Sequence, residues 1–281
     1  MKKIGFIDYY ISEWHANNYP AWIEEINKKS GEDFVVAYAW AELDVSPVDG
    51  RTTDQWCEAF KVERCGSIAE LCQMCDYILI LAPSDPDKHL AYAKEALKFG
   101  KNTYIDKTFA PDYATAKKIY EIAEKQGTKI FSSSALRYAD ALNDYNGNAK
   151  NVLTTGGGRT LDEYIVHQIE MVVKAMGVGA EKVLVTTEED RHYCKIAYGD
   201  GRMATLFFAP MLDFAAYITG EDGVTNLHPV QSGFFKTLIE EILRFLASGK
   251  APFPKEQTLE VMKIREGILK AAQKAGVWQK L

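Results

Sequence analysis

Lys107 is the residue of this 281-residue sequence whose type and position most directly suggest chemistry. It lies in the tetrapeptide IDKT, just past the end of a short apolar segment. A lysine at the carboxyl end of a buried strand loses part of its hydration, and desolvation makes an ammonium group easier to deprotonate. The neighbouring Asp106 could hold the ammonium group by a charge-assisted hydrogen bond. A solvated loop lysine explains the position equally well, so the position alone does not identify a catalyst.

His167 is a second candidate, because two carboxylates lie near it at helical spacing. Apolar residues three and four apart predict a helix over residues 161–176, with Glu163 four residues before the histidine and Glu170 three after it. These three side chains share one stripe, on the side away from the apolar residues. A carboxylate beside an imidazole fixes its tautomer and supports proton transfer. A surface helix with ordinary charged pairs is the simpler interpretation of this stripe taken by itself.

The segment that would position Lys107 alternates strands with helices. Residues 77–82 (YILILA) are continuously apolar, as in a strand covered on both faces, and Pro83 ends them. The other strands expected here are residues 2–7, 34–39, 102–105 and 129–131, and the expected helices are residues 21–29, 54–60, 67–75, 87–99 and 112–125. Such alternation implies parallel pairing through right-handed crossovers. Ligands of such sheets bind beyond the carboxyl ends of the strands, where residues 8–10, 106–108 and 132–134 would lie.

The pattern changes after residue 134. Residues 135–160 are polar, the helix over residues 161–176 follows, strands are expected at 182–187, 191–198 and 202–208, and helices at 234–246 and 256–275. The last two strands flank a GDG turn, which is typical of a hairpin, whereas residues 211–232 are expected to form a surface connection. We therefore predict an α/β, Rossmann-like domain with a parallel sheet over residues 1–134. An α+β domain with an open antiparallel sheet would follow over residues 135–281, with its last helices free to pack back on the first domain.

The composition limits the partners of the chain. Lys and Arg number 33 and Asp and Glu number 39, which gives a net charge of -6 without a basic block and argues against nucleic-acid binding. No stretch approaches the ~18 apolar residues of a membrane helix. Asp8 interrupts the apolar run at the N-terminus too early for a signal peptide. We expect a cytoplasmic protein that binds a small molecule.

The cysteines are better interpreted as core residues than as ligands. They are Cys57, Cys65, Cys72, Cys75 and Cys194. An odd number with most of them close together does not suggest a disulfide framework and fits a reducing compartment. The C-x-x-C spacing of Cys72 and Cys75 also occurs in zinc sites, but no second close pair completes a tetrahedral set. Ile68, Leu71 and these two cysteines share one helical face, so we expect core positions and no metal.

The order of these features resembles the glucose–fructose oxidoreductase/inositol dehydrogenase (Gfo/Idh/MocA) family over essentially the whole chain. A strand at KKIGFI opens the sequence, and DKHLAYAKEALKFGKNTYIDKTFA follows the apolar strand that ends in proline. The family usually has GKHVLVEKPLA where this chain has GKNTYIDKTFA, and an Arg-Phe segment where it has SALRYADAL. GGGRTLDEYIVHQIEMVVKAMG is similar to the family's GGG…D-x-G-x-H-x-x-D…G helix, and the closing segment from FFKTLIEE to GVWQKL is similar as well.

The resemblance implies a role for each matching residue. Lys107 would be the catalytic lysine and His167 the second acid–base residue, with Glu163 in place of the Asp one turn before it. Arg137, Tyr138 and Glu170 would line the substrate pocket. The family's antiparallel sheet often mediates oligomerisation, so a homo-oligomer formed through the C-terminal sheet is implied.

The resemblance also implies NAD or NADP, bound along Asp8, Tyr10, Ile11, Pro83 and Asp106. The family has G-x-G-x-x-G after the first strand, which lets the backbone approach the pyrophosphate. This chain has DYYISEWH in its place. The glycine fingerprint is therefore absent where the cofactor would need it.

The end of the second expected strand departs from the family too. Trp40 stands where an acid is usual, although Glu42 or Asp44 could bind a ribose hydroxyl instead. Two hypotheses follow. The first is an NAD(P)-dependent oxidoreductase acting on a sugar, polyol or related hydroxy compound, with Lys107 and His167 handling the proton. The second is a non-redox relative that has lost dinucleotide binding, and that binds a carbohydrate-like ligand or performs cofactor-free acid–base chemistry.

Overall fold

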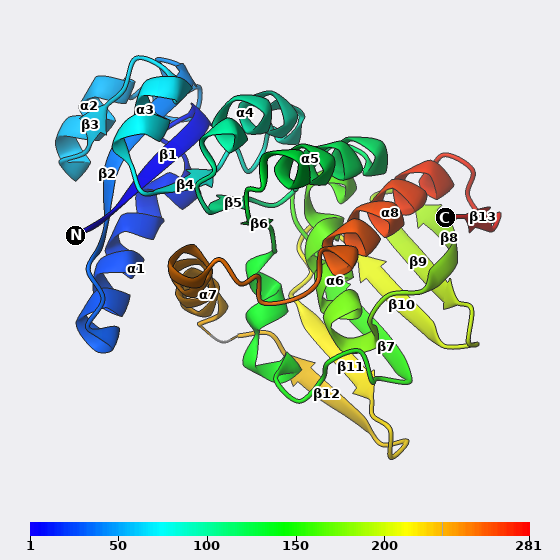
Figure 1. Cartoon of the computed structure of the whole chain (residues 1–281). Helices are drawn as coiled ribbons and strands as arrows, with labels where there is room; N and C mark the ends of the chain where they lie inside the picture. The colour runs from blue at the N-terminus through cyan, green and yellow to red at the C-terminus, as the bar shows by residue number, and fades with distance from the viewer. Residues whose placement is uncertain (232) are drawn as a thin grey trace. The chain divides into compact units, whose positions relative to one another are not determined.

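The computed structural model describes residues 1–231 and 233–281, and the chain divides into two compact units (Figure 1). The first unit consists of Met1–Ser132 and Lys236–Pro252, and the second of Ser133–Phe235 and Phe253–Leu281. The sequence had suggested a boundary between residues 134 and 135. Each unit is built around its own sheet.

The first unit has a parallel sheet in its core. Its strands are β1 (Lys2–Tyr10), β2 (Phe34–Leu43), β3 (Glu63–Arg64), β4 (Tyr77–Ile80), β5 (Thr103–Ile105) and β6 (Ile130–Phe131). The order across the sheet is β3-β2-β1-β4-β5-β6, and each neighbouring pair is parallel. This is the strand order of a Rossmann-type sheet, so the α/β prediction is confirmed.

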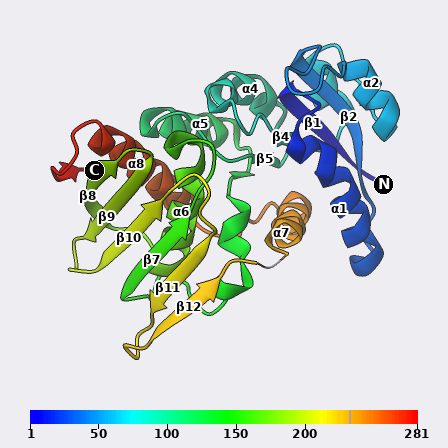
Figure 2. The ribbon, with the colours of Figure 1, turned by 180° about the vertical axis from the view of Figure 1, so that it is seen from behind.

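Helices cover both faces of this sheet. They are α1 (Trp14–Ser30), α2 (Thr53–Phe60), α3 (Ile68–Met74), α4 (His89–Ala96), α5 (Tyr113–Gln126) and most of α7 (Phe234–Ser248), with 3-10 turns η1 (Pro86–Lys88) and η2 (Leu97–Phe99). Figure 2 shows α4 and α5 side by side on one face and α1 near α7 on the other. Ile78, Leu79 and Ile80 of β4 are fully buried for this reason, as their apolar run predicted.

Gly5 of β1 lets α3 pack closely on the sheet. A Cβ at this position would lie 2.4 Å from Cδ2 of Leu71 and 3.1 Å from Sγ of Cys75. Ile68, Leu71, Cys72 and Cys75 are all buried, so their predicted core positions are confirmed. Burial raises the pKa of the Cys72 thiol to about 12, which keeps it protonated and unreactive. Within the described ranges, no group of three or more His, Cys, Asp and Glu side chains is arranged to hold a metal ion.

The first turn is shorter than the sequence indicated. β1 continues to Tyr10 rather than ending at residue 7, and α1 begins at Trp14 rather than at residue 21. The predicted start was wrong because Pro20, which favours the first turn of a helix, lies in the interior of α1. Only residues 11–13 therefore separate the first strand from the first helix.

The second unit has a mixed sheet. Its strands are β7 (Asn151–Gly156), β8 (Ala180–Glu188), β9 (Arg191–Tyr198), β10 (Met203–Phe208), β11 (Ala215–Thr219), β12 (Thr225–Pro229) and β13 (Gln279–Lys280), in the order β12-β11-β7-β10-β9-β8-β13. The β7–β10 pair is parallel and the other neighbouring pairs are antiparallel. An α+β second half with a largely antiparallel open sheet is therefore confirmed, and the parallel pair is an addition to the prediction.

Four strands of this sheet, β7, β11, β12 and the short β13, were not predicted. β7 falls in the polar stretch over residues 135–160. β11 and β12 fall in residues 211–232, where a surface connection was expected. That expectation was wrong for the described residues of this range. Ser232 lies outside the described residues. The inward positions of β7 are Val152, Thr154 and Gly156. Small and polar residues on the buried face weaken the alternation by which a strand is recognised.

Two long helices cover one face of the second sheet. They are α6 (Leu161–Met176) and α8 (Lys255–Ala272), preceded by the 3-10 turns η3 (Ala135–Tyr138) and η4 (Asp140–Leu142). Ile165, Ile169 and Val172 of α6 are fully buried and belong to the core of this unit. No helix in the described part of the chain is both long enough and apolar enough to span a membrane.

Candidate functional site

Lys107 lies at the carboxyl edge of the first sheet, directly after β5. The backbone N–H of Asp106 still donates to the carbonyl of Ile80 at 2.9 Å, which fixes this segment against β4. The half-buried side chain of Lys107 donates from Nζ to the carbonyl oxygen of Pro83 at 3.1 Å, and its backbone N–H donates to Oδ1 of Asp106 at 2.8 Å. Lys107, Pro83 and Asp106, three of the predicted site residues, therefore lie together.

Asp106 holds a histidine that the sequence reasoning did not select. Its carboxylate is fully buried and contacts Nδ1 of His15, while the hydroxyl of Tyr104 donates to its Oδ1 at 3.1 Å. Burial raises the pKa of Asp106, but the charge and hydrogen bond of His15, together with the charge and backbone N–H of Lys107, outweigh this effect, so that the pKa is lowered overall. His15 was missed because residue 15 was not expected to be helical. Its position seven residues past Asp8, close after the first strand, was the available signal.

Asp8 is a second buried carboxylate at this edge. Its Oδ1 accepts hydrogen bonds from the backbone N–H of Tyr9 at 2.7 Å and of Ala82 at 3.0 Å, and within the described residues its Oδ2 has no hydrogen-bond partner. Burial, and then the charge of Glu13, raise the pKa of Asp8 well above its usual range. Asp8 is therefore harder to ionise in the folded protein than in the unfolded chain.

Glu13 caps the N-terminus of α1 with its own side chain. Its Oε2 accepts from the backbone N–H of His15 at 2.7 Å, and its Oε1 accepts from that of Ala16 at 2.5 Å. The carboxylate is buried, and burial raises its pKa although His15 and the two backbone N–H groups act in the opposite direction. The first N–H groups of a helix bind anions, so Glu13 fills a place that a bound phosphate could take.

The residues of this turn do not fit the pyrophosphate of NAD or NADP. In a Rossmann-type sheet the pyrophosphate lies at the N-terminus of the helix after the first strand, where glycines admit it. Here the Glu13 carboxylate occupies that end of α1, and the buried Asp8 adds a second acid. Tyr10 is half-buried at the end of β1, and Ile11 is buried in the turn itself. These side chains cover the backbone that the glycine fingerprint leaves open.

The acids at the end of β2 are engaged in other contacts. Glu42 accepts from Nζ of Lys88, at 2.5 Å, and from the hydroxyl of Tyr92, at 2.8 Å. Asp44 lies 2.9 Å from Arg64 in an ion pair. Both carboxylates are thus held by groups of the first unit at the position where a ribose hydroxyl would bind.

In the second unit, His167 lies on α6 beside a serine. Its Nδ1 is 2.6 Å from Oγ of Ser134, and the rings of Tyr164 and Phe214 are 5.6 and 5.9 Å from the imidazole ring. Glu163 forms an ion pair with Arg159, four residues before it on the chain. The imidazole is therefore oriented by a hydroxyl and two aromatic rings.

Glu170 is not on an exposed stripe, contrary to the prediction for α6. It is buried, and its Oε2 accepts from Nη1 of Arg137 at 3.2 Å, while its Oε1 accepts from the backbone N–H of Ser134 at 3.1 Å. Arg137 is buried too and lies over the ring of Phe253, 3.7 Å from its centroid. The prediction failed because a buried arginine, distant in sequence, compensates the buried charge. Tyr138, the last residue of η3, is half-buried.

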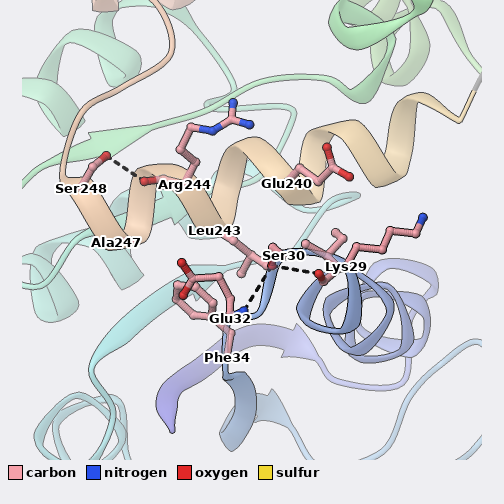
Figure 3. Close-up of a pocket in the computed structure, with 10 residues that line it drawn as sticks. Lys29, Ser30, Glu32, Phe34, Glu240, Leu243, Arg244, Ala247 and Ser248 are labelled. Atoms are coloured by element: carbon pink, nitrogen blue, oxygen red, sulfur yellow. Dashed lines mark hydrogen bonds between the residues drawn. The ribbon is translucent and has the colours of Figure 1, made fainter.

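Two pockets lie outside these hydrogen-bond networks. A pocket of about 350 Å³ in the second unit is lined by Gly157, Gly158, Pro210, Met211, Leu212, Asp213, Phe214, Val230 and Gln231. Because Phe214 also packs against His167, this pocket adjoins the histidine. Another pocket, of about 480 Å³, lies in the first unit between the end of α1 and α7, with Phe34 and Leu243 among its apolar lining (Figure 3). It includes none of the predicted site residues.

Gly157 shapes the pocket beside His167. A Cβ at this position would lie 2.0 Å from the carbonyl oxygen of Ala209 and 2.7 Å from that of Pro210. The loop after β10 can therefore approach β7 only if residue 157 is a glycine. The GGG run was expected to be part of a polar connection. Its Gly157 allows the loop after β10 to pack closely against the backbone that follows β7.

Comparison with known proteins agrees with this fold. Residues 29–134 match the model of a family described as an oxidoreductase family with an NAD-binding Rossmann fold. The uncharacterized oxidoreductase YhhX of Escherichia coli (strain K12) is 36% identical over 55 residues, which are 20% of this chain and 16% of that protein. The sequence match to that relative therefore concerns a small part of either protein.

Solved structures resemble the whole chain. A probable dehydrogenase from Thermotoga maritima superposes with a TM-score of 0.78 at 13% identity, over 99% of this chain and 98% of its own. GenD2 from gentamicin A biosynthesis, solved in complex with NAD, gives a TM-score of 0.78 at 10% identity, over 100% and 97%. A myo-inositol dehydrogenase from Corynebacterium glutamicum gives 0.76 at 13% identity, over 100% and 98%. At these identities the likeness concerns the fold.

Proposed function

Because the Rossmann domain of this chain belongs to the Gfo/Idh/MocA oxidoreductase family, we propose that the protein is an enzyme acting on a sugar, a polyol or a related hydroxy compound. Lys107 and His167 are its acid–base groups. The observation that carries the proposal is the position of Lys107, half-buried at the ligand-binding edge of the parallel sheet and held by the Pro83 carbonyl and by Asp106.

Lys107 can act as the proton carrier at a hydroxyl or carbonyl oxygen of the substrate. Its Nζ already donates to a carbonyl oxygen, that of Pro83, at 3.1 Å. A substrate oxygen at a similar distance would receive the same kind of hydrogen bond and could then exchange a proton with the ammonium group. Asp106 anchors the backbone of the lysine and so limits the positions that its side chain can reach.

His167 is the second acid–base group of the proposal. Ser134 holds Nδ1, so Nε2 is the ring nitrogen assigned to the substrate. Glu163, paired with Arg159, contributes negative charge at the start of the same helix. The pocket lined by Gly157 and Phe214 is a suitable volume for a sugar-sized ring. Glu170 accepts from the backbone N–H of Ser134, Arg137 pairs with Glu170, and Tyr138 follows Arg137 on η3. We propose that these residues shape the substrate side.

The proposal has two versions, which differ in the cofactor. In the first, the enzyme is an NAD(P)-dependent oxidoreductase, as the family match and the dehydrogenases among its structural relatives suggest. NAD or NADP would then lie along Asp8, Tyr10, Ile11, Pro83 and Asp106. This version requires that the Glu13 carboxylate leave the end of α1, because the turn does not otherwise admit a pyrophosphate.

In the second version the chain performs acid–base chemistry, or binds a carbohydrate-like ligand, without a dinucleotide. A specific observation favours it, namely the capping of α1 by the buried Glu13 carboxylate. The geometry supports this second version better than the first. Lys107 and His167 are the acid–base groups wherever the chain catalyses a reaction, with or without a dinucleotide.

A titration with nicotinamide cofactors separates the two versions. Purified protein would be titrated with NADH and with NADPH up to millimolar concentration while the nicotinamide fluorescence is followed. We expect no saturable signal from either. Saturable binding of one of them would replace the second version by the first. In either version Lys107→Met should abolish turnover, whereas Lys118→Met, a change at an exposed lysine of α5, should not.

The outer face of the second sheet supports a homo-oligomer. Leu153 of β7, Tyr217 of β11 and Leu227 of β12 are paired across neighbouring strands and are all exposed, at 37%, 42% and 52%. A contiguous exposed apolar stripe on a sheet is a common contact between subunits. We place the protein in the cytoplasm, since its five cysteines are buried free thiols.

A further inference from the structure

The N-terminus of α1 is a feature of the Rossmann unit at which this chain contradicts the cofactor that its family implies. The first N–H groups of a helix have no partner within the helix and carry a partial positive charge. In this fold they normally face the phosphates of a dinucleotide. Whatever satisfies these groups in this chain therefore determines whether a phosphate can bind there.

Glu13 satisfies them from within the chain. Its two carboxylate oxygens accept the backbone N–H groups of His15 and Ala16, and its own carbonyl accepts the N–H of Asn17 at 3.0 Å, which begins the helix. The backbone of Glu13 is extended, with φ of -130° and ψ of 172°, as at an ordinary N-cap. The carboxylate thus supplies to α1 what a phosphate supplies in the family: negative charge and acceptor oxygens.

The turn before Glu13 is fixed in this arrangement. The backbone N–H of Glu13 donates to the carbonyl of Ile11 at 2.9 Å, and the hydroxyl of Ser12 donates to Oδ2 of Asp49 at 2.7 Å. The hydroxyl of Ser46 donates in turn to the carbonyl of Ser12 at 2.9 Å. The loop after β2 therefore holds the turn from the other side, and Asp49 brings a further carboxylate close to it.

We propose that Glu13 is an internal replacement for the dinucleotide phosphate, and that it closes the family's cofactor site in this chain. Asp8 acts in the same direction, because its charge, where it is ionised, repels both the Glu13 carboxylate and a phosphate. Removal of the Glu13 charge weakens this exclusion, so that NAD(H) binds more tightly. This inference is independent of the acid–base roles assigned to Lys107 and His167.

The test compares the NADH affinity of the wild type with that of Glu13→Ser. Serine is a good N-cap without charge, so the helix end is kept while the competing anion is removed. Asp112→Ser is the matched control, because Asp112 caps α5 of the same unit by accepting from the backbone N–H of Thr115 at 2.7 Å. Calorimetric titration with NADH would give each affinity. Competition by inorganic pyrophosphate would locate the binding at the phosphate site.

We expect Glu13→Ser to bind NADH at least about tenfold more tightly than the wild type, and pyrophosphate to compete. Asp112→Ser should bind NADH as the wild type does. If Glu13→Ser unfolds, Glu13→Gln, which keeps the shape of the side chain, should give the same gain. The inference is overturned if neither neutral variant gains affinity, if the control gains as much, or if the wild type already binds NADH at micromolar concentration. The last result would leave the acid–base proposal standing in its NAD(P)-dependent version.

Discussion

Replacement of Asp106 by asparagine should destabilise the first unit strongly at neutral pH. The change keeps the size of a fully buried side chain but removes the negative charge that contacts His15 and that accepts from Tyr104 and from the backbone of Lys107. A hydrogen bond to a charged group contributes about 1.5–3 kcal/mol, and Asp106 accepts such bonds from Tyr104 and from the backbone of Lys107. We expect the free energy of unfolding of this unit to fall by about 3 kcal/mol at pH 7.

The loss should depend on pH in a defined direction. The pKa of Asp106 is lowered in the folded protein, because His15 and Lys107 together outweigh the effect of burial. A carboxylate of this kind contributes stability above its unfolded pKa of about 3.9, and the contribution is lost as the pH falls through the folded pKa. The difference between wild type and Asp106→Asn should therefore be complete at pH 7 and should shrink as the pH falls below about 4.

Tryptophan fluorescence during urea denaturation can follow this unit selectively. Four of the five tryptophans, Trp14, Trp22, Trp40 and Trp56, belong to the first unit, and Trp278 belongs to the second. Asp87→Asn, at an exposed aspartate near the same sheet edge, is the control and should change the stability by less than about 0.5 kcal/mol. A loss below about 1 kcal/mol for Asp106→Asn at pH 7, or a loss that does not shrink in acid, would refute the reasoning.

Three further predictions concern other parts of the molecule. Asp8→Asn should become more stable than the wild type as the pH increases above about 4. Burial and a neighbouring carboxylate raise the pKa of Asp8 in the folded protein, so the wild type loses stability as the pH rises towards that folded pKa. Thermal melts in which the difference between variant and wild type is the same at pH 5 and pH 8 would contradict this. Gly157→Ala should lower the melting temperature markedly, because the new Cβ would lie 2.0 Å from a carbonyl oxygen, whereas Gly233→Ala, with no atom of the described residues within 4 Å, should not. Tyr217→Glu should shift the protein towards monomers in light scattering, and a wild type that is already monomeric would exclude the sheet contact.

The Rossmann half of the fold followed well from its sequence, and the reason is physical. Strands that are covered on both faces must be apolar throughout, and YILILA is a clear example that leads directly to the edge carrying Lys107. The second sheet was harder to predict. β11 buries Ala216 and Ile218 but exposes Tyr217, and β12 is largely exposed, so neither has the strong alternation that would separate it from a loop.

The candidate site could be predicted only in part from the sequence, because its most important contacts join residues that are far apart in sequence. The sequence showed that the glycine fingerprint is absent from the turn after β1. It did not show which group binds the helix N-terminus in place of a phosphate. That Glu13 turns back to cap α1, and that His15 meets Asp106, depends on where the helix begins. The helix was predicted to begin too late because Pro20, which favours the first turn of a helix, lies in the interior of α1. The buried pairing of Glu170 with Arg137 could not be read from helical spacing, because these two residues are also far apart in sequence.

Proton exchange without a dinucleotide would show whether Lys107 catalyses acid–base chemistry in the absence of NAD(P). Wild type, Lys107→Met and the control Lys118→Met would be incubated in D₂O with a panel of aldoses and ketoses, with no NAD(P) present, and deuterium at the carbon next to the carbonyl would be measured by mass spectrometry. We expect incorporation with at least one compound, retained in the control and reduced by about 10²-fold or more in Lys107→Met. Turnover that appears only when NAD(P) is added, or that survives in Lys107→Met, would contradict this expectation.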